Sequence, residues 1–100
     1  MEERQTLRRA TKLWQEAYRY QMEGELDRAI ERYQRSIEAH PTAEAHTFLG
    51  WTLSFQGRLE EATEECLRAI AIDPEFGNPH NDIGVYLMQR DKAGRGDPMV

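Results

Sequence analysis

The side chains in this sequence that could do chemistry are few and scattered. The single cysteine, Cys66, lies among apolar residues at helical spacing, and no histidine is placed to activate its thiol. The three histidines, His40, His46 and His80, lack the i, i+4 spacing of paired metal ligands on a helix. We therefore predict neither a metal site nor a cofactor.

A run of glutamates gives the nearest approach to a catalytic pattern. Glu60, Glu61, Glu64 and Glu65 resemble the paired carboxylates of acid–base catalysis. They are instead expected on the solvated face of a helix, where Glu64 can pair with Arg68 one turn later. The sequence contains no nucleophile with an adjacent base and no phosphate-binding loop, so an enzyme is not predicted.

Size and charge narrow the functional class. The 100 residues are enough for one domain, and the net charge of −5 weighs against nucleic acid as a partner. Acidity is concentrated in residues 43–76, with seven acidic and two basic groups, whereas residues 1–22 carry five basic and three acidic ones. That basic start could meet an acidic partner, but a solvated helix face is the favoured interpretation. One cysteine, no signal peptide and no long apolar run predict the cytoplasm and no membrane contact.

The chain repeats itself with a period of 33 residues. The recurring pairs are Gly24 and Gly57, Leu26 and Leu59, Ala29 and Ala62, and Pro41 and Pro74. A fixed period in the low thirties is typical of stacked helical hairpins, none of which can bury its apolar face alone.

Local signals place five helices along this repeat. Gly24 and Gly57 interrupt helical patterns, Thr42 is a plausible N-cap, and Asn78-Pro79 supplies a cap and a first-turn proline. The expected helices cover residues 5–22, 26–40, 43–55, 59–72 and 78–90. Gly50 and Gly84 are expected to allow close helix packing, at a helix-propensity cost of about 1 kcal/mol each.

These positions resemble the tetratricopeptide repeat over about residues 10–90. In the second repeat the matching residues are Leu49, Gly50, Gly57, Ala62, Ala69 and Pro74, with Leu53 and Cys66 as departures. The first repeat departs at Glu16 and Ser36, where apolar or small residues are usual. The resemblance implies an all-α fold, an α-solenoid of antiparallel hairpins with a concave groove. The expected solenoid comprises two full repeats, at about 10–42 and 43–76, and a half repeat at 77–90 that serves as a C-terminal capping helix. The expected domain is 1–91, with 92–100 as a disordered tail.

The resemblance also implies which residues face the groove. The predicted peptide-binding set is Trp14, Tyr18, Thr47, Trp51, Phe55, Asn81, Val85 and Met88. Some relatives hold a carboxylate with lysine and asparagine there, but this basic clamp is missing here. Either tryptophan could instead be a core residue. Asn81 is the preferred polar contact, since an amide can pair with a ligand backbone.

The last helix gives the sequence an alternative function. Ile83, Tyr86 and Leu87 should face the place where a further helix would pack, which would permit self-association into a homodimer. The favoured function is a non-catalytic adaptor or scaffold module that binds a peptide segment of a protein partner. The alternative is a structural self-assembly module.

Overall fold

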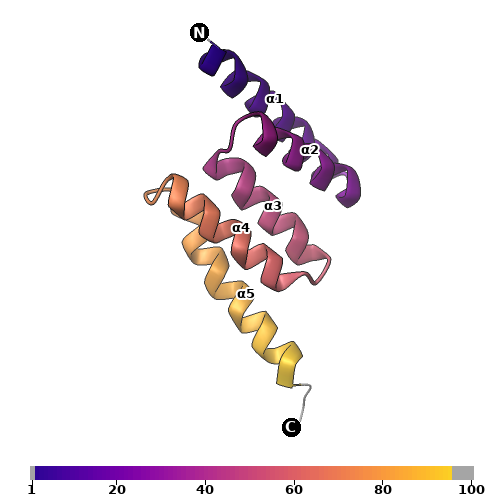
Figure 1. The fold of residues 1–100 in the computed structure, drawn as a ribbon. Coiled ribbons are helices and arrows are strands. Elements are labelled where there is room, and N and C mark those ends of the chain that lie inside the picture. The colour runs from indigo at the N-terminus through magenta and orange to yellow at the C-terminus, as the bar shows by residue number, and fades with distance from the viewer. Residues whose placement is uncertain (1, 96–100) are drawn as a thin grey trace.

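The computed structural model describes residues 2–95, and the side chains of residues 2–91, as an elongated stack of helices (Figure 1). Its extents are 57 × 29 × 17 Å. The helices within residues 2–95 are α1 (Glu2–Met22), α2 (Leu26–Ala39), α3 (Ala43–Phe55), α4 (Leu59–Ile72) and α5 (Asn78–Arg95). These residues contain no strand, so the prediction of an all-α repeat fold is confirmed.

Two antiparallel hairpins and one further helix form two layers. Helices α1 and α2 pack as one hairpin, α3 and α4 as the next, and α5 packs on α4. Helix α3 contacts both α1 and α5, whereas α2 and α4 do not contact each other within the described residues. The layer of α1, α3 and α5 is therefore the more closely spaced of the two.

The turns inside the hairpins depend on glycine, as the sequence predicts. Gly24 and Gly57 have φ angles of 81° and 77°, a left-handed conformation that side chains with a Cβ rarely adopt. The predicted cap of α3 is also confirmed, because the Ala45 N–H donates to Thr42 Oγ1 at 3.1 Å. Short-range chemistry thus determines the turn inside each hairpin and the start of α3.

Small residues allow the helices of each hairpin to approach closely. Ala29 and Ala62, which occupy the same repeat position, are fully buried. At Gly50 the backbones of α3 and α4 are so close that a Cβ built there would lie 2.9 Å from the carbonyl oxygen of Ala62 on α4. The close approach expected at Gly50 is therefore present. The one expected at Gly84 is wrong, since a Cβ there would meet nothing within 4 Å.

The two departures of the first repeat have a structural explanation. Ser36 is fully buried, and its hydroxyl donates to the carbonyl of Ala10 at 2.6 Å, which ties α2 to α1. Glu16 pairs with Arg32 of α2, with 3.4 Å between the charged atoms. Polar contacts thus replace apolar packing at these positions.

The end of the chain differs from the prediction in one respect. Helix α5 continues to Arg95, beyond the end expected at residue 90. The tail expected over residues 92–100 stays a prediction, and residues 96–100 lie outside the described part. Among the described helices, none combines the length and the apolarity that crossing a membrane requires.

Candidate functional site

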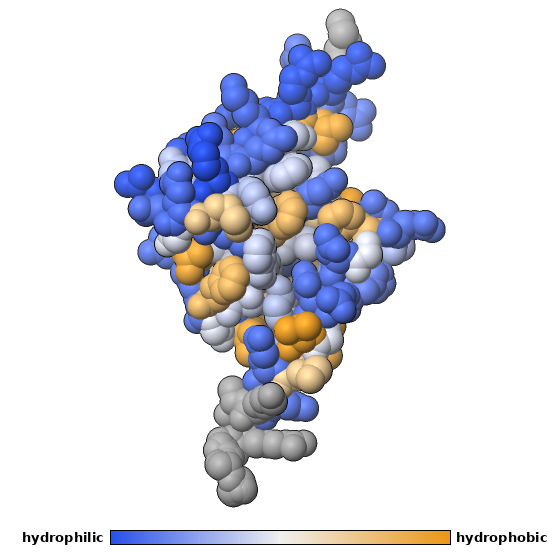
Figure 2. Space-filling model, turned by 180° about the vertical axis from the view of Figure 1, so that it is seen from behind, coloured by the Kyte–Doolittle hydropathy of each residue, from blue (hydrophilic) through white to orange (hydrophobic). Residues whose placement is uncertain are grey.

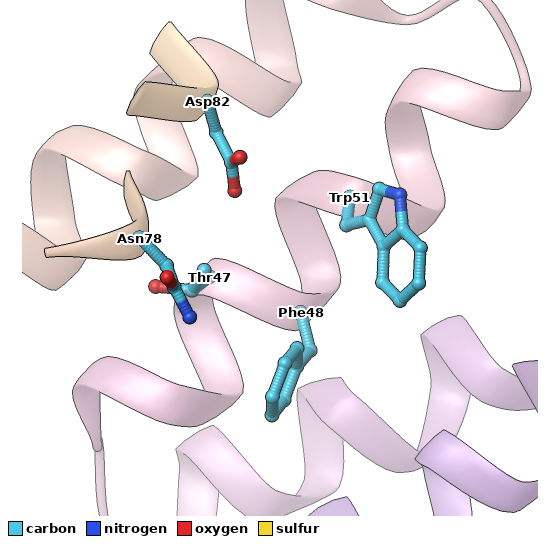
Figure 3. Close-up of a pocket in the computed structure, with 5 residues that line it drawn as sticks. All are labelled: Thr47, Phe48, Trp51, Asn78 and Asp82. Atoms are coloured by element: carbon cyan, nitrogen blue, oxygen red, sulfur yellow. The ribbon is translucent and has the colours of Figure 1, made fainter. Parts of the chain in front are cut away.

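A pocket of about 210 Å³ opens between α3 and α5 (Figure 3). Its lining residues are Thr47, Phe48 and Trp51 from α3 and Asn78 and Asp82 from α5. Residues four apart on a helix share one face, so Thr47 and Trp51 form one wall and Asn78 and Asp82 the other. The pocket is therefore a product of the contact between two repeats.

Three predicted residues of α3 lie in or beside this pocket. Thr47 is only 2 % exposed and Trp51 is half-buried, and both line the opening. Phe55 is exposed, and its ring centroid lies 5.3 Å from that of Trp51. The Trp51 indole thus lines the pocket and contacts the aromatic ring of Phe55 one helical turn later.

The two predicted residues of α1 reach this region through Phe48. The Phe48 ring lies 5.5 Å from the ring of Trp14 and 5.6 Å from that of Tyr18. Trp14 is half-buried and packs against the hydrophobic core, whereas Tyr18 stays exposed. Trp14 therefore has a packing role, and Tyr18 is accessible beside it.

The predicted residues of α5 do not line the pocket. Asn81, Val85 and Met88 are all exposed on α5, and the pocket is lined by Asn78 and Asp82 instead. Asp82 occupies the same repeat position as Phe48, and Asn78 lies one turn before it. The repeat register alone does not identify these two residues, because it matches Thr47 to Asn81.

One buried polar group of the pocket lacks an internal partner among the described residues. Thr47 Oγ1 is buried and makes no hydrogen bond within the described residues. Burial raises the pKa of the half-buried Asp82 carboxyl above its ordinary value. Hydroxyl, carboxylate and amide groups that face an opening without internal partners are suited to bind a polar group from outside.

The residues expected to form an uncovered stripe on α5 differ in their placement. Tyr86 is 4 % exposed and belongs to the core, because it packs onto the second hairpin. Ile83 is half-buried against the same core, while Leu87 remains exposed. The expectation of an accessible Tyr86 is therefore wrong.

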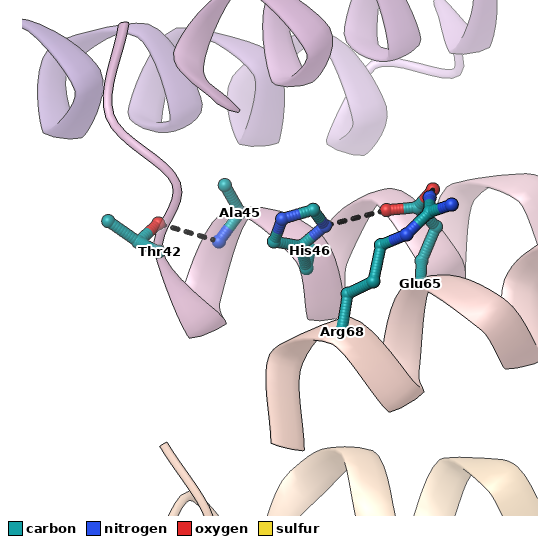
Figure 4. A network of polar contacts seen from close by, with 5 residues as sticks. All are labelled: Thr42, Ala45, His46, Glu65 and Arg68. Atoms are coloured by element: carbon teal, nitrogen blue, oxygen red, sulfur yellow. Dashed lines mark hydrogen bonds and ion pairs between the residues drawn. The ribbon is translucent and has the colours of Figure 1, made fainter. Parts of the chain in front are cut away.

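A buried polar network joins α3 to α4 (Figure 4). His46 Nδ1 lies 2.7 Å from Glu65 Oε1, and Arg68 Nη1 donates to Glu65 Oε2 at 2.7 Å. The side chains of His46 and Glu65 are only 8 % and 13 % exposed. Arg68 therefore pairs with Glu65 and not, as the sequence had predicted, with Glu64. Glu65 faces the interior, so its predicted place on the solvated face is wrong.

Cys66 of α4 is fully buried in the core cluster that also contains Leu53 of α3 and Tyr86 of α5. Its side chain has no exposed area, and burial raises the pKa of the thiol to about 12. The group is therefore a neutral thiol at neutral pH and serves as a small core residue.

The surface opposite to the view of Figure 1 is uneven in character. Figure 2 shows hydrophobic residues gathered in patches across the middle of the molecule and toward its C-terminal end, whereas the N-terminal part is mostly hydrophilic. The exposed large apolar residues include Leu67, Ile72, Val85, Leu87 and Met88.

The sequence of the second hairpin decides the family. Residues 43–76, which form α3, the Gly57 turn and α4, match the tetratricopeptide repeat profile. The chain belongs to the tetratricopeptide repeat family. Within this repeat, Gly57 makes the turn, and Gly50 and Ala62 lie where α3 and α4 approach closely.

Two similar proteins agree with this assignment. The chain is 31 % identical over 71 residues to the TPR repeat-containing thioredoxin TTL4 of Arabidopsis thaliana; the match covers 70 % of this chain but spans about a tenth (10 %) of that relative's length. The solved structure of the second TPR of Spaghetti (RPAP3) bound to the HSP90 peptide SRMEEVD superposes with a TM-score of 0.85. That match has 24 % identity and covers 94 % of this chain and 88 % of the other, so it shows a common fold.

Proposed function

We propose that this tetratricopeptide repeat protein is a non-catalytic interaction module, and that it binds an extended peptide segment in the groove lined by α1, α3 and α5. The observation that carries the proposal is the pocket between α3 and α5, where aromatic rings and unpartnered polar groups lie together. Aromatic anchors beside polar groups are typical of the centre of a protein-binding surface.

The groove offers anchors at successive repeats. Trp51 and Phe55 present aromatic surface on α3, Tyr18 extends this surface onto α1, and Val85 and Met88 are exposed on α5. An extended peptide places alternate side chains on one side, so several such contacts can be made at once. Asn81 stays in the proposed contact set as a partner for the peptide backbone.

The charge of the pocket separates this groove from that of the structural neighbour. The neighbour binds a peptide with two glutamates and a final aspartate, whereas the charged group of this pocket is the carboxylate of Asp82. Like charges disfavour the acidic residues of such a ligand at this pocket.

Selection from a library of random peptides tests the proposal. Trp51→Ala removes an aromatic anchor from the groove, and Leu67→Ala is the matched control because Leu67 is an exposed apolar residue of α4. Loss of a hot-spot aromatic should weaken a selected peptide by at least about thirtyfold, or 2 kcal/mol. Selected peptides that bind the Trp51→Ala variant as tightly as the wild type would refute the proposed site.

A second function, self-association through α5, is favoured by one observation. Gly84 occupies the repeat position of Gly50, but no atoms lie within 4 Å of a Cβ built there. Gly50 lies on the side of α3 that packs against α4, whereas the equivalent side of α5, which carries Gly84, is not covered by another described helix. Leu87 lies on this uncovered side, one turn after Gly84.

Light scattering separates this second function from the first. Self-association through α5 predicts a concentration-dependent mass that Leu87→Glu abolishes while peptide binding is retained. A constant monomer mass at high protein concentration would exclude it.

A further inference from the structure

The half-buried carboxylate of Asp82 has no cationic partner among residues 2–91. The ion pairs formed by residues 2–91 do not include it. It lies instead near the neutral groups of Cys66 and Tyr86, whose pKa values its charge helps to raise. Carboxylates removed from water are normally paired, because desolvation disfavours the charge. Asp82 is thus a charge in a partly desolvated site, open to a cation from outside.

The Thr47 hydroxyl is an independent sign of a missing ligand. This residue is 2 % exposed, and its Oγ1 is buried without a hydrogen-bond partner among the described residues. Buried hydroxyls are normally satisfied, so an orphan that lines a pocket indicates a donor or acceptor supplied by a bound molecule. The Asn78 amide adds a carbonyl acceptor on the opposite wall.

The three polar groups match the donors of a basic side chain. Asn78 and Asp82 extend from α5 toward α3, where Thr47 lies beside Asn78 (Figure 3). Together they present a hydroxyl, an amide carbonyl and a carboxylate to one opening, and these groups can accept three hydrogen bonds. An ammonium group has three donors and no acceptor, and a guanidinium has five donors.

The apolar walls suit the remainder of such a side chain. Phe48 and Trp51 line the same pocket, and aromatic faces attract both the methylene stem and the charge of lysine or arginine. The volume of about 210 Å³ is below the range of roughly 300–1,000 Å³ typical of small-molecule sites. The pocket therefore fits one side chain better than a whole metabolite.

We infer that the pocket between α3 and α5 binds a lysine or arginine side chain of the partner peptide, with Asp82 as the counter-ion and Thr47 and Asn78 as further acceptors. The inference rests on the proposed peptide groove and adds the chemical class of residue that the groove selects. Trp51 and Phe48 hold the stem, and the charge requirement distinguishes this groove from a carboxylate-binding one.

The test begins with selection of peptides from the random library on the wild-type protein, followed by binding measurements with the best sequence. We expect the selected peptides to share a lysine or arginine. Asp82→Asn should weaken the best peptide on the order of tenfold or more, as loss of a charged hydrogen bond does. Asp91→Asn, an exposed position farther along α5, is the matched control and should leave the affinity unchanged.

A double-mutant cycle decides whether the two charges meet. Replacing the shared base of the peptide by methionine keeps an unbranched apolar stem. It should weaken binding to the wild type but have little further effect on the Asp82→Asn variant. Peptides that bind through Trp51 but share no base, or that bind the Asp82→Asn variant equally well, would overturn this inference and leave the proposed groove intact. A selection that yields no Trp51-dependent peptide would overturn both.

Discussion

Gly50 and Gly84 provide a matched pair of alanine substitutions with opposite expected effects. Both glycines lie within helices, 34 residues apart, at the same position of the repeat. A Cβ on Gly50 would lie 2.9 Å from Ala62 O, 3.4 Å from Cys66 Sγ and 3.5 Å from Glu65 Cβ. A Cβ on Gly84 would meet nothing within 4 Å. The two substitutions therefore share their helix-propensity gain and differ in packing.

The magnitude at Gly50 follows from the nature of the obstacle. Ala62 O is a backbone atom inside α4, so α3 and α4 must separate by a few tenths of an ångström to admit a methyl group. Overpacking of this kind costs about 1–3 kcal/mol, and replacing glycine in a helix returns about 1 kcal/mol. We expect Gly50→Ala to lower the free energy of unfolding by up to about 2 kcal/mol and Gly84→Ala to raise it by about 0.5–1 kcal/mol.

Thermal and urea unfolding followed by circular dichroism measures both changes. The two variants differ by the packing cost of about 1–3 kcal/mol. For a domain of this size each kcal/mol shifts Tm by roughly 4–8 °C, so their Tm values should differ by roughly 4–24 °C. A stabilised Gly50→Ala variant would refute the inferred contact between α3 and α4. A destabilised Gly84→Ala variant would show that another surface covers this side of α5.

Three further predictions concern buried polar groups. Thr47→Val keeps the shape of the side chain but removes the unpartnered hydroxyl, so we expect about 1 kcal/mol greater stability in urea unfolding; a lower midpoint would show that the hydroxyl is already satisfied. Burial raises the pKa of Asp82 in the folded state above its ordinary value of 3.8, so the folded protein binds more protons there and stability falls as pH rises through the interval between the two values. Asp82→Asn should therefore raise Tm at neutral pH but not below the ordinary pKa, and an equal gain at both pH values would contradict this reasoning. Because Cys66 is fully buried with a pKa of about 12, iodoacetamide should label it slowly in the native protein and rapidly in urea; rapid native labelling, read by mass spectrometry, would contradict the inferred enclosure.

Much of the helical architecture could be predicted from the sequence because its causes are local. Positive φ angles at Gly24 and Gly57 and the cap at Thr42 are set by the residues themselves and their nearest neighbours. The repeat period then indicates that the hairpins stack, since each apolar stripe needs a neighbour. The predicted groove positions Thr47 and Trp51 follow from this register and do line the pocket.

Only the tertiary structure decided which faces of different helices meet. Helical periodicity assigns a residue to a face, but the rotation of α5 against α3 depends on packing between segments far apart in sequence. That rotation brings Asn78 and Asp82 to the pocket and buries Tyr86. Gly50 and Gly84 are identical in type and register, yet only Gly50 is opposed by a helix. Local patterns define each helix, whereas non-local packing determines which side chains remain available to a partner.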